Sequence, residues 1–174
     1  MSLSKLNVDG KFFLQAEEMR DDQLPEFNRI RNSCRKFLHD QRHFSLDDTI
    51  KWYIKRIDSM YYPILTTEES MIGYFRLSPR YDQWPVCIGA DLDERFRGQG
   101  IAKGLYPQVM NEVYSQFDTQ LIYLEVLSHN FAALRLYESL GFQYAYSRKL
   151  DNHQESIRME FPIIDFYTRY KEFK

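Results

Sequence analysis

The sequence predicts one α/β domain, residues 1–174, with a mixed central sheet of about seven strands and four helices in the order βααβββαβαββ. Two patterns support this prediction. Apolar residues recur every three or four positions in some segments, as in helices, and run together or alternate in shorter ones, as in strands. In addition, a helical segment separates the apolar runs 86–92 and 121–127. Such a crossover makes two strands of one sheet parallel.

The N-terminal part is predicted to hold a short strand and two helices. The strand covers residues 11–15. The first helix covers residues 21–38, with apolar side chains at three- and four-residue spacing and Pro25 in its first turn. The second runs from Ser45 to about residue 57, because Ser45 is a good N-cap and is followed by acidic residues that suit a helix N-terminus.

The central part is predicted to form three strands and the crossover helix. Strands 62–66 and 71–77 flank a hairpin-sized loop, and a third strand, 86–92, follows the loop 78–85. The crossover helix is expected over residues 98–116.

After the crossover helix, the sequence predicts strand 121–127 and then a helix over residues 130–140 with Gly141 at its C-cap. Strands 143–148 and 156–161 are expected to form a closing hairpin. The aromatic tail 162–174 places Phe166, Tyr170 and Phe173 on one helical face, which is expected to pack on its own domain rather than mark a partner.

Composition indicates a soluble globular protein and excludes several classes. Hydrophobic residues make up 44% and charged residues 28%, and the net charge of −2 gives no basic excess for nucleic acid. No apolar run suits a membrane span or a signal peptide, so we expect a cytoplasmic protein without a membrane partner. Cys34 and Cys87 favour two buried thiols over a disulfide, and no His, Cys, Asp or Glu cluster has metal-ligand spacing, so no metal is expected.

A glycine-rich turn lies between strand 86–92 and the crossover helix. It comprises Arg97, Gly98, Gln99, Gly100, Ile101 and Ala102. Backbone N–H groups at a helix N-terminus have no partner within the helix, and the helix dipole favours an anion there. The two glycines have no side chain to block a diphosphate. The turn therefore predicts an anion site, with an ordinary tight turn as the alternative.

Together with a second block, this turn resembles the GCN5-related N-acetyltransferase (GNAT) superfamily. The turn matches the family's Arg/Gln-x-x-Gly-x-Gly/Ala loop at Arg97, Gly100 and Ala102. The second block, residues 124–142, matches its strand, Asn, helix and Tyr pattern, closed by Gly-Phe. The resemblance covers roughly residues 70–148 and implies the GNAT fold, whose element order is the one predicted above, with acetyl-CoA as co-substrate.

The resemblance also implies which residues hold the coenzyme. N–H groups of residues 97–102 would bind the diphosphate, and the strand edge at Ala90, Asp91 and Leu92 would pair with the pantetheine amides. For that edge, an ordinary core strand is the alternative. The Arg97 side chain either adds charge or is solvated. Asn130 is expected to cap its helix and to contact the coenzyme.

Two residues are implied to take part in catalysis. Tyr137 matches the family tyrosine that protonates the departing CoA thiolate, a step for which a phenol is a suitable acid; the alternative is a core tyrosine. Glu125 lies in the Leu-Glu-Val context in which ribosomal-protein N-terminal acetyltransferases place a general base, and a structural acceptor is equally compatible. His129 is expected to be a solvent-exposed loop residue, and His39, His43 and His153 show no ligand spacing.

Direct attack by the amine in a ternary complex is the expected mechanism, because no nearby sequence pairs Cys87 with a histidine. The N-terminal half resembles enzymes that acetylate the amino group of nucleotide-linked amino sugars. The resemblance rests on an Arg-Asn pair, a Phe-Ser pair followed by acidic residues, and Trp52, while Thr49 stands where those enzymes commonly carry a His. The alternatives are packing roles for these aromatic residues, a protein N-terminal acetyltransferase, and a non-catalytic acyl-CoA-binding domain. Expected partners are acetyl-CoA and a small-molecule or peptide amine, and the chain is expected to be a monomer or homodimer.

Overall fold

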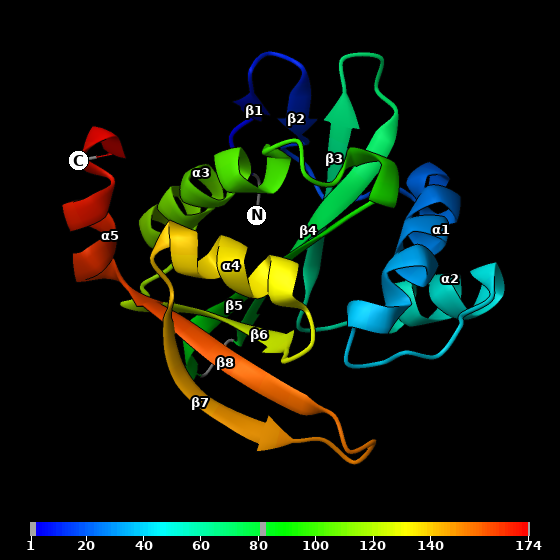
Figure 1. Cartoon of the computed structure of the whole chain (residues 1–174). Coiled ribbons are helices and arrows are strands. Elements are labelled where there is room, and N and C mark those ends of the chain that lie inside the picture. The colour runs from blue at the N-terminus through cyan, green and yellow to red at the C-terminus, as the bar shows by residue number, and fades with distance from the viewer. Residues whose placement is uncertain (1–2, 81–82, 174) are drawn as a thin grey trace.

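The computed structural model, which describes residues 3–80 and 83–173, is built around one sheet (Figure 1). Its strands lie in the order β1-β2-β3-β4-β5-β6-β8-β7. They are β1 (Leu6–Val8), β2 (Phe12–Leu14), β3 (Met60–Thr66), β4 (Met71–Arg80), β5 (Gln83–Leu92), β6 (Leu121–Leu127), β7 (Gln143–Lys149) and β8 (Glu155–Pro162). Strands β5 and β6 pair in parallel, which confirms the predicted crossover, and the other neighbours are antiparallel.

The helices are α1 (Leu24–Cys34), α2 (Leu46–Lys55), α3 (Ile101–Gln116), α4 (Phe131–Leu140) and α5 (Ile163–Arg169). The predicted cap of α2 is confirmed, because the Ser45 side chain accepts a hydrogen bond from the Asp48 backbone N–H. Helix α2 ends at Lys55 because Arg56 has an extended backbone. The expected helix 21–38 is shorter, since short 3-10 turns flank α1 on both sides.

Two elements were not in the predicted order, so the described residues form eight strands and five α-helices rather than seven and four. Strand β1 has three residues, too few for a periodic pattern, and it is ordered by pairing with β2. Helix α5 forms within the aromatic tail.

Helix α3 begins at Ile101, not at the predicted residue 98. Gly98 and Gly100 have φ angles of +75° and +77°, in the left-handed region that a right-handed helix excludes. Strands β4 and β5 also extend into the predicted loop 78–85, of which Tyr81 and Asp82 lie outside the described residues.

Side chains of the strands divide the core between the two faces of the sheet, and on β4 they alternate from Tyr74 onward, after a register shift with β3 at Met71–Gly73. On β4, Ile72, Phe75 and Leu77 join the large core that includes residues of α3 and α4, whereas Met71 and Tyr74 join a smaller core with α1 and α2. The sheet is therefore covered on both faces, which lets helices from opposite faces approach one point where two strands separate (Figure 1).

The tail packs through α5. Phe166 is fully buried, and its ring lies 5.2 Å from the ring of Tyr114 on α3 and 6.3 Å from that of Phe161 on β8. Within the described ranges, none of the helices combines the length and apolar character needed to cross a bilayer.

Candidate active site

Strands β5 and β6 pair over only a short stretch and then separate. Their register joins Val86 to Ile122 and Cys87 to Tyr123. Beyond these pairs, β5 continues to Leu92 against β4 alone, and β6 continues to Leu127 against β8 alone. The separation leaves backbone groups of β5 without a β6 partner and opens a gap in the middle of the sheet.

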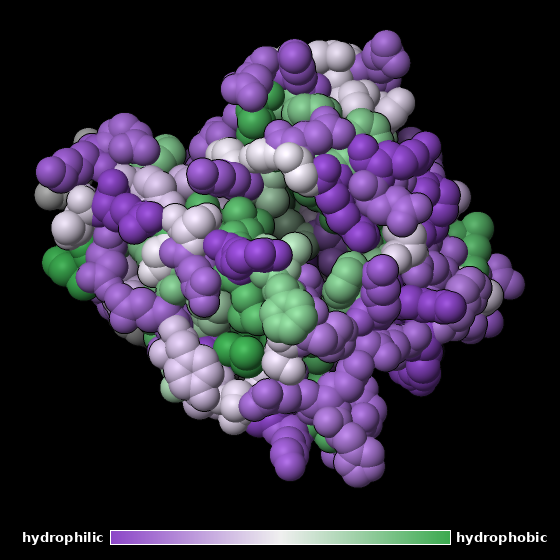
Figure 2. Space-filling model, in the orientation of Figure 1, coloured by the Kyte–Doolittle hydropathy of each residue, from purple (hydrophilic) through white to green (hydrophobic). Residues whose placement is uncertain are grey.

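A cavity of about 340 Å³ lies at this gap. Gly89 and Asp91 are paired with Arg76 and Tyr74 of β4, so they face α1 and α2, whereas Tyr137 belongs to the core beneath α3 and α4. Both faces of the sheet therefore line one cavity, with polar side chains from His39, Arg76, Asp91, Glu125, Asn130 and Tyr137. Figure 2 shows this side of the molecule hollowed between α4 and the α1–α2 pair.

Tyr137 projects from α4 to the cavity, and its hydroxyl accepts a hydrogen bond from the Tyr106 hydroxyl of α3 at 3.3 Å. Burial raises the pKa of Tyr137 to about 12, so the phenol holds its proton at neutral pH. The Tyr106 donor also stabilises the phenolate that remains once that proton is lost. Tyr137 is therefore a protonated hydroxyl at the cavity, available as a hydrogen-bond and proton donor.

Glu125 lies on β6 and also lines the cavity. Its carboxylate forms an ion pair with Arg148 of β7 at 3.2 Å, and its side chain is 25% exposed. The ion pair with Arg148 fits the structural role that the sequence allowed for Glu125. Because Glu125 also lines the cavity, it can still be reached by a proton donor there.

The predicted pantetheine edge lies on the open part of β5. Ala90 and Asp91 line the cavity, whereas Leu92 is not among the lining residues. The Leu92 carbonyl accepts hydrogen bonds from Arg97 Nε at 3.0 Å and from Cys34 Sγ at 3.4 Å. Burial raises the pKa of Asp91 against the opposing effects of Tyr74 and Arg76. Residues 90 and 91 therefore offer the open backbone, and the Leu92 carbonyl is already engaged.

The glycine-rich turn presents free N–H groups to open space. The first backbone hydrogen bond of α3 runs from Gly104 N–H to the Gly100 carbonyl, so the N–H groups of residues 101–103 have no partner within the helix. A Cβ atom built on Gly98 or Gly100 meets nothing within 4 Å, and both residues are exposed. The turn thus has the room and the polarity that an anion site requires.

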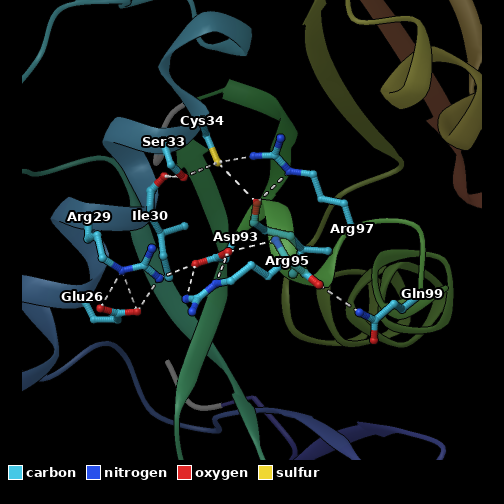
Figure 3. Close-up of polar contacts among 10 residues, drawn as sticks. Glu26, Arg29, Ile30, Ser33, Cys34, Asp93, Arg95, Arg97 and Gln99 are labelled. Carbon is cyan, nitrogen blue, oxygen red and sulfur yellow. Dashed lines mark hydrogen bonds and ion pairs between the residues drawn. The ribbon is translucent and has the colours of Figure 1, made fainter.

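The Arg97 side chain has partners on β5 and α1. Its guanidinium donates to the Leu92 carbonyl and, at 3.1 Å, to the Cys34 thiol of α1 (Figure 3). Beside it, the buried Asp93 carboxylate accepts from Arg95 of the turn and from Arg29 of α1, and these donors hold its pKa well below the usual range. Polar contacts therefore fasten the glycine-rich turn and the residues before it to α1.

Asn130 and His129 occupy the turn between β6 and α4. Asn130 Oδ1 accepts from the Ala133 N–H at 3.3 Å, which confirms the cap, and Asn130 also lines the cavity. His129 is exposed and contacts the Lys36 carbonyl. Cys34 and Cys87 are buried free thiols. In residues 3–80 and 83–173, no group of His, Cys, Asp or Glu is arranged to hold a metal ion.

Among the cavity residues that the sequence analysis did not predict are His39 and Arg76. His39 has its Nε2 atom 2.7 Å from the Ser156 Oγ atom of β8, a partner 117 positions away that no local pattern indicates. Arg76 lies between Phe75 and Leu77 in an apolar strand. A charged side chain in an apolar strand should be paired or face a cleft, so this pattern could have indicated Arg76.

Comparisons with known proteins agree with this geometry. The model of the acetyltransferase (GNAT) family matches residues 17–142. A spermine/spermidine N(1)-acetyltransferase of Bacillus subtilis (strain 168) is 25% identical over 124 residues, which cover 66% of this chain and 76% of that protein.

Solved structures share the fold. A spermidine N-acetyltransferase from Vibrio cholerae in complex with CoA and spermine has a TM-score of 0.78 at 18% identity, covering 91% of this chain and 99% of that chain. RimL, a ribosomal L7/L12 alpha-N-protein acetyltransferase in complex with CoA, has a TM-score of 0.75 at 16% identity, covering 93% and 99%. Neither these structures nor the Bacillus relative is described as acting on an amino sugar, the acceptor class that the N-terminal half had suggested.

Proposed function

Because the chain belongs to the acetyltransferase (GNAT) family, we propose that it transfers an acetyl group from acetyl-CoA to a primary amine by direct attack. The observation that supports this proposal most strongly is the separation of β5 and β6, which brings Tyr137 and the polar residues of the opposite sheet face to one cavity. Donor and acceptor can then approach one point from opposite sides of the sheet. The glycine-rich turn would bind the diphosphate, and the open edge at Ala90 and Asp91 would pair with the pantetheine.

Each proton in the reaction has a candidate group. The amine nitrogen forms a bond to the thioester carbon, the carbon–sulfur bond breaks, and Tyr137 donates its proton to the departing thiolate. The proton that the amine loses passes to Glu125 or to water. Glu125 lies 3.2 Å from Arg148 and lines the cavity, which places its carboxylate within reach of the acceptor.

For the acceptor, we propose first a nucleotide-linked amino sugar. Trp52 lines the cavity, is 41% exposed, and stacks on Phe27 with ring centroids 6.1 Å apart, which gives a flat apolar surface for a base or sugar. Thr49, which stands where the amino-sugar enzymes commonly carry a His, also lines the cavity. Both residues lie on α2, at the acceptor side of the sheet.

A polyamine is the second candidate, favoured by the spermine and spermidine enzymes among the relatives. A polycation needs free negative charge in its binding site. The cavity has three carboxylates, but Asp40 is bonded to Arg42 at 2.6 Å and Glu125 to Arg148, while burial raises the pKa of Asp91. The charges of the cavity therefore support the amino sugar over the polyamine. A protein N-terminus, as in the RimL structure, is tested as a third acceptor.

Replacing Tyr137 with Phe tests the reaction. The variant keeps the ring and its packing and loses one proton donor, so kcat should fall roughly 10²–10⁴-fold. The affinity for acetyl-CoA should change little, because the hydroxyl acts on the departing sulfur. CoA release with each of the three acceptor classes, together with calorimetry of donor binding, measures both effects.

Tyr114→Phe is the matched control. Tyr114 is a buried tyrosine of α3. Its hydroxyl donates to the Phe161 carbonyl, and Tyr114 is not among the residues that line the cavity. This variant should retain the wild-type kcat even where it loses stability. Normal turnover in Tyr137→Phe would remove Tyr137 from the mechanism, and acetyl-CoA binding without transfer to any amine would leave a binding domain.

A further inference from the structure

Arg76 presents a positive charge to the cavity without a carboxylate partner. It lies on β4 directly opposite Gly89 of β5, and it lines the cavity. In the described part of the chain, no Asp or Glu forms an ion pair with it, and its Nε atom is buried without a hydrogen-bond partner. Arginine keeps its charge in proteins, so its environment must accommodate a full positive charge.

The immediate neighbours of Arg76 do not neutralise it. Its polar contacts are with the Tyr61 hydroxyl and the Cys87 thiol, and burial raises the pKa of both groups, so both remain uncharged. Asp91 is the carboxylate that acts on the charge of Arg76, and burial raises the pKa of Asp91, which favours its protonated form. An unpaired cation among aromatic side chains interacts strongly with any anion that enters.

Arg76 is positioned to contact the acceptor. A Cβ atom built on Gly89 would lie 3.5 Å from the Arg76 Nη2 atom, an ordinary van der Waals distance, so the guanidinium lies directly against β5 at Gly89. Gly89 is next to Ala90 and Asp91, the edge proposed to pair with the pantetheine of the coenzyme. Arg76 also faces α1 and α2, on the same side of the sheet as Trp52 and Thr49.

From this geometry we propose that Arg76 binds an oxyanion, a carboxylate or a phosphate, that the acceptor carries near its primary amine. A guanidinium offers two parallel N–H donors to such a group, which adds orientation to the charge interaction. The same charge repels the additional ammonium groups of a polyamine. The inference rests on the proposed acetyl transfer and narrows its acceptor to amines that carry an acidic group.

Matched pairs of amines test the assignment and distinguish the two sources of oxyanion. Alanine against alaninamide forms the carboxylate arm, glucosamine 6-phosphate against glucosamine forms the phosphate arm, and spermidine is the polycation. In the wild-type enzyme, kcat/KM should be at least about tenfold higher for the acidic member of one pair than for its neutral partner. In Arg76→Gln this ratio should fall towards unity, mainly through KM, while turnover of the neutral amine is retained.

Two further variants keep the test decisive. Arg76→Lys retains the charge and loses the paired donors, so it should keep part of the preference and should fold if Arg76→Gln does not. Arg158→Gln removes an arginine that pairs with Glu160 on β8, is not among the cavity-lining residues, and should leave the ratio unchanged.

The outcomes separate this inference from the proposed function. Three results would overturn the role of Arg76 and leave acetyl transfer standing. They are equal activity on both members of each pair, a preference for spermidine, and an acidic-to-neutral kcat/KM ratio that is unchanged in Arg76→Gln and Arg76→Lys. Absence of CoA release with every amine, from protein that binds acetyl-CoA, overturns the transfer itself and the role of Arg76 with it.

Discussion

His39 illustrates how single residues acquire their properties in the cavity. Its ring is held by Ser156 of β8, and it faces Glu125 of β6, Arg76 of β4 and Arg148 of β7. Burial lowers the pKa of His39, Glu125 opposes this shift, and the two arginines reinforce it. The imidazole is therefore neutral near neutral pH.

This lowered pKa predicts a pH-dependent stability. The unfolded chain binds a proton at His39 with a pKa of about 6.5, whereas the folded chain binds it only at lower pH. The free energy of unfolding should therefore fall as the pH decreases below about 6.5, by less than about 1.4 kcal/mol per pH unit, the limit for one proton. Denaturation of His39→Gln should show a weaker fall between about pH 7.5 and about pH 5.5.

His43→Gln is the control, because His43 is exposed on the adjoining loop and should leave the pH dependence as it is in the wild type. The same slope in His39→Gln and the wild type would contradict the prediction.

At the scale of elements, the turn between β5 and α3 combines two tasks. Its glycines expose N–H groups to open space, while Arg97 donates to the Leu92 carbonyl of β5 and to the Cys34 thiol of α1, and Asp93 accepts from Arg29 of α1. Contacts with β5 and α1 therefore hold the turn in place. This arrangement fixes the position of the N-terminus of α3 relative to the cavity.

Gly100→Glu should weaken acetyl-CoA binding at least about tenfold, or about 1.4 kcal/mol. The substitution places a negative charge where the diphosphate is expected and strains a backbone with a φ angle of +77°. Calorimetry on the folded variant measures the effect. Gly10→Glu is the matched control, because Gly10 has a φ angle of +66° and open space around it, but lies in the turn between β1 and β2.

Gly10→Glu should keep the wild-type affinity although it carries similar strain and the same charge. Unchanged affinity in folded Gly100→Glu would reject the diphosphate site.

At the scale of the whole molecule, the C-terminal tail packs against the sheet and α3. Phe166 of α5 is fully buried and joins the same core as Phe142, Phe161 and Tyr114. Tyr170 adds a hydrogen bond to the Leu140 carbonyl at the end of α4. Helix α5 therefore supports the helix that carries Tyr137, although it lies outside the cavity lining.

Phe166→Ala should lower the free energy of unfolding by about 3–5 kcal/mol, because it leaves a cavity in the core. Ile164→Ala on the same helix is the control, since Ile164 is 73% exposed and its loss should change stability by about 0.5 kcal/mol or less. Chemical denaturation compares the two. Equal stability losses would show that α5 does not pack as described.

Local signals were enough to predict most elements. Ser45 and Asn130 cap their helices through side-chain hydrogen bonds to residues three positions later, and the parallel pairing of β5 and β6 follows from the crossover helix. Strand β1 and the late start of α3 were not predicted. The first depends on pairing with β2, and the second on left-handed backbone at Gly98 and Gly100.

The sequence by itself determined the family, the glycine-rich turn and the position of Tyr137 on its helix, because each depends on residues close together along the chain. Only the tertiary structure decided which side chains share the cavity. His39, Arg76, Glu125 and Tyr137 come from a loop, two strands and a helix, and they meet because β5 and β6 separate. The physical reason is that hydrogen-bond register and sheet twist are set by packing between distant segments, which local periodicity does not record.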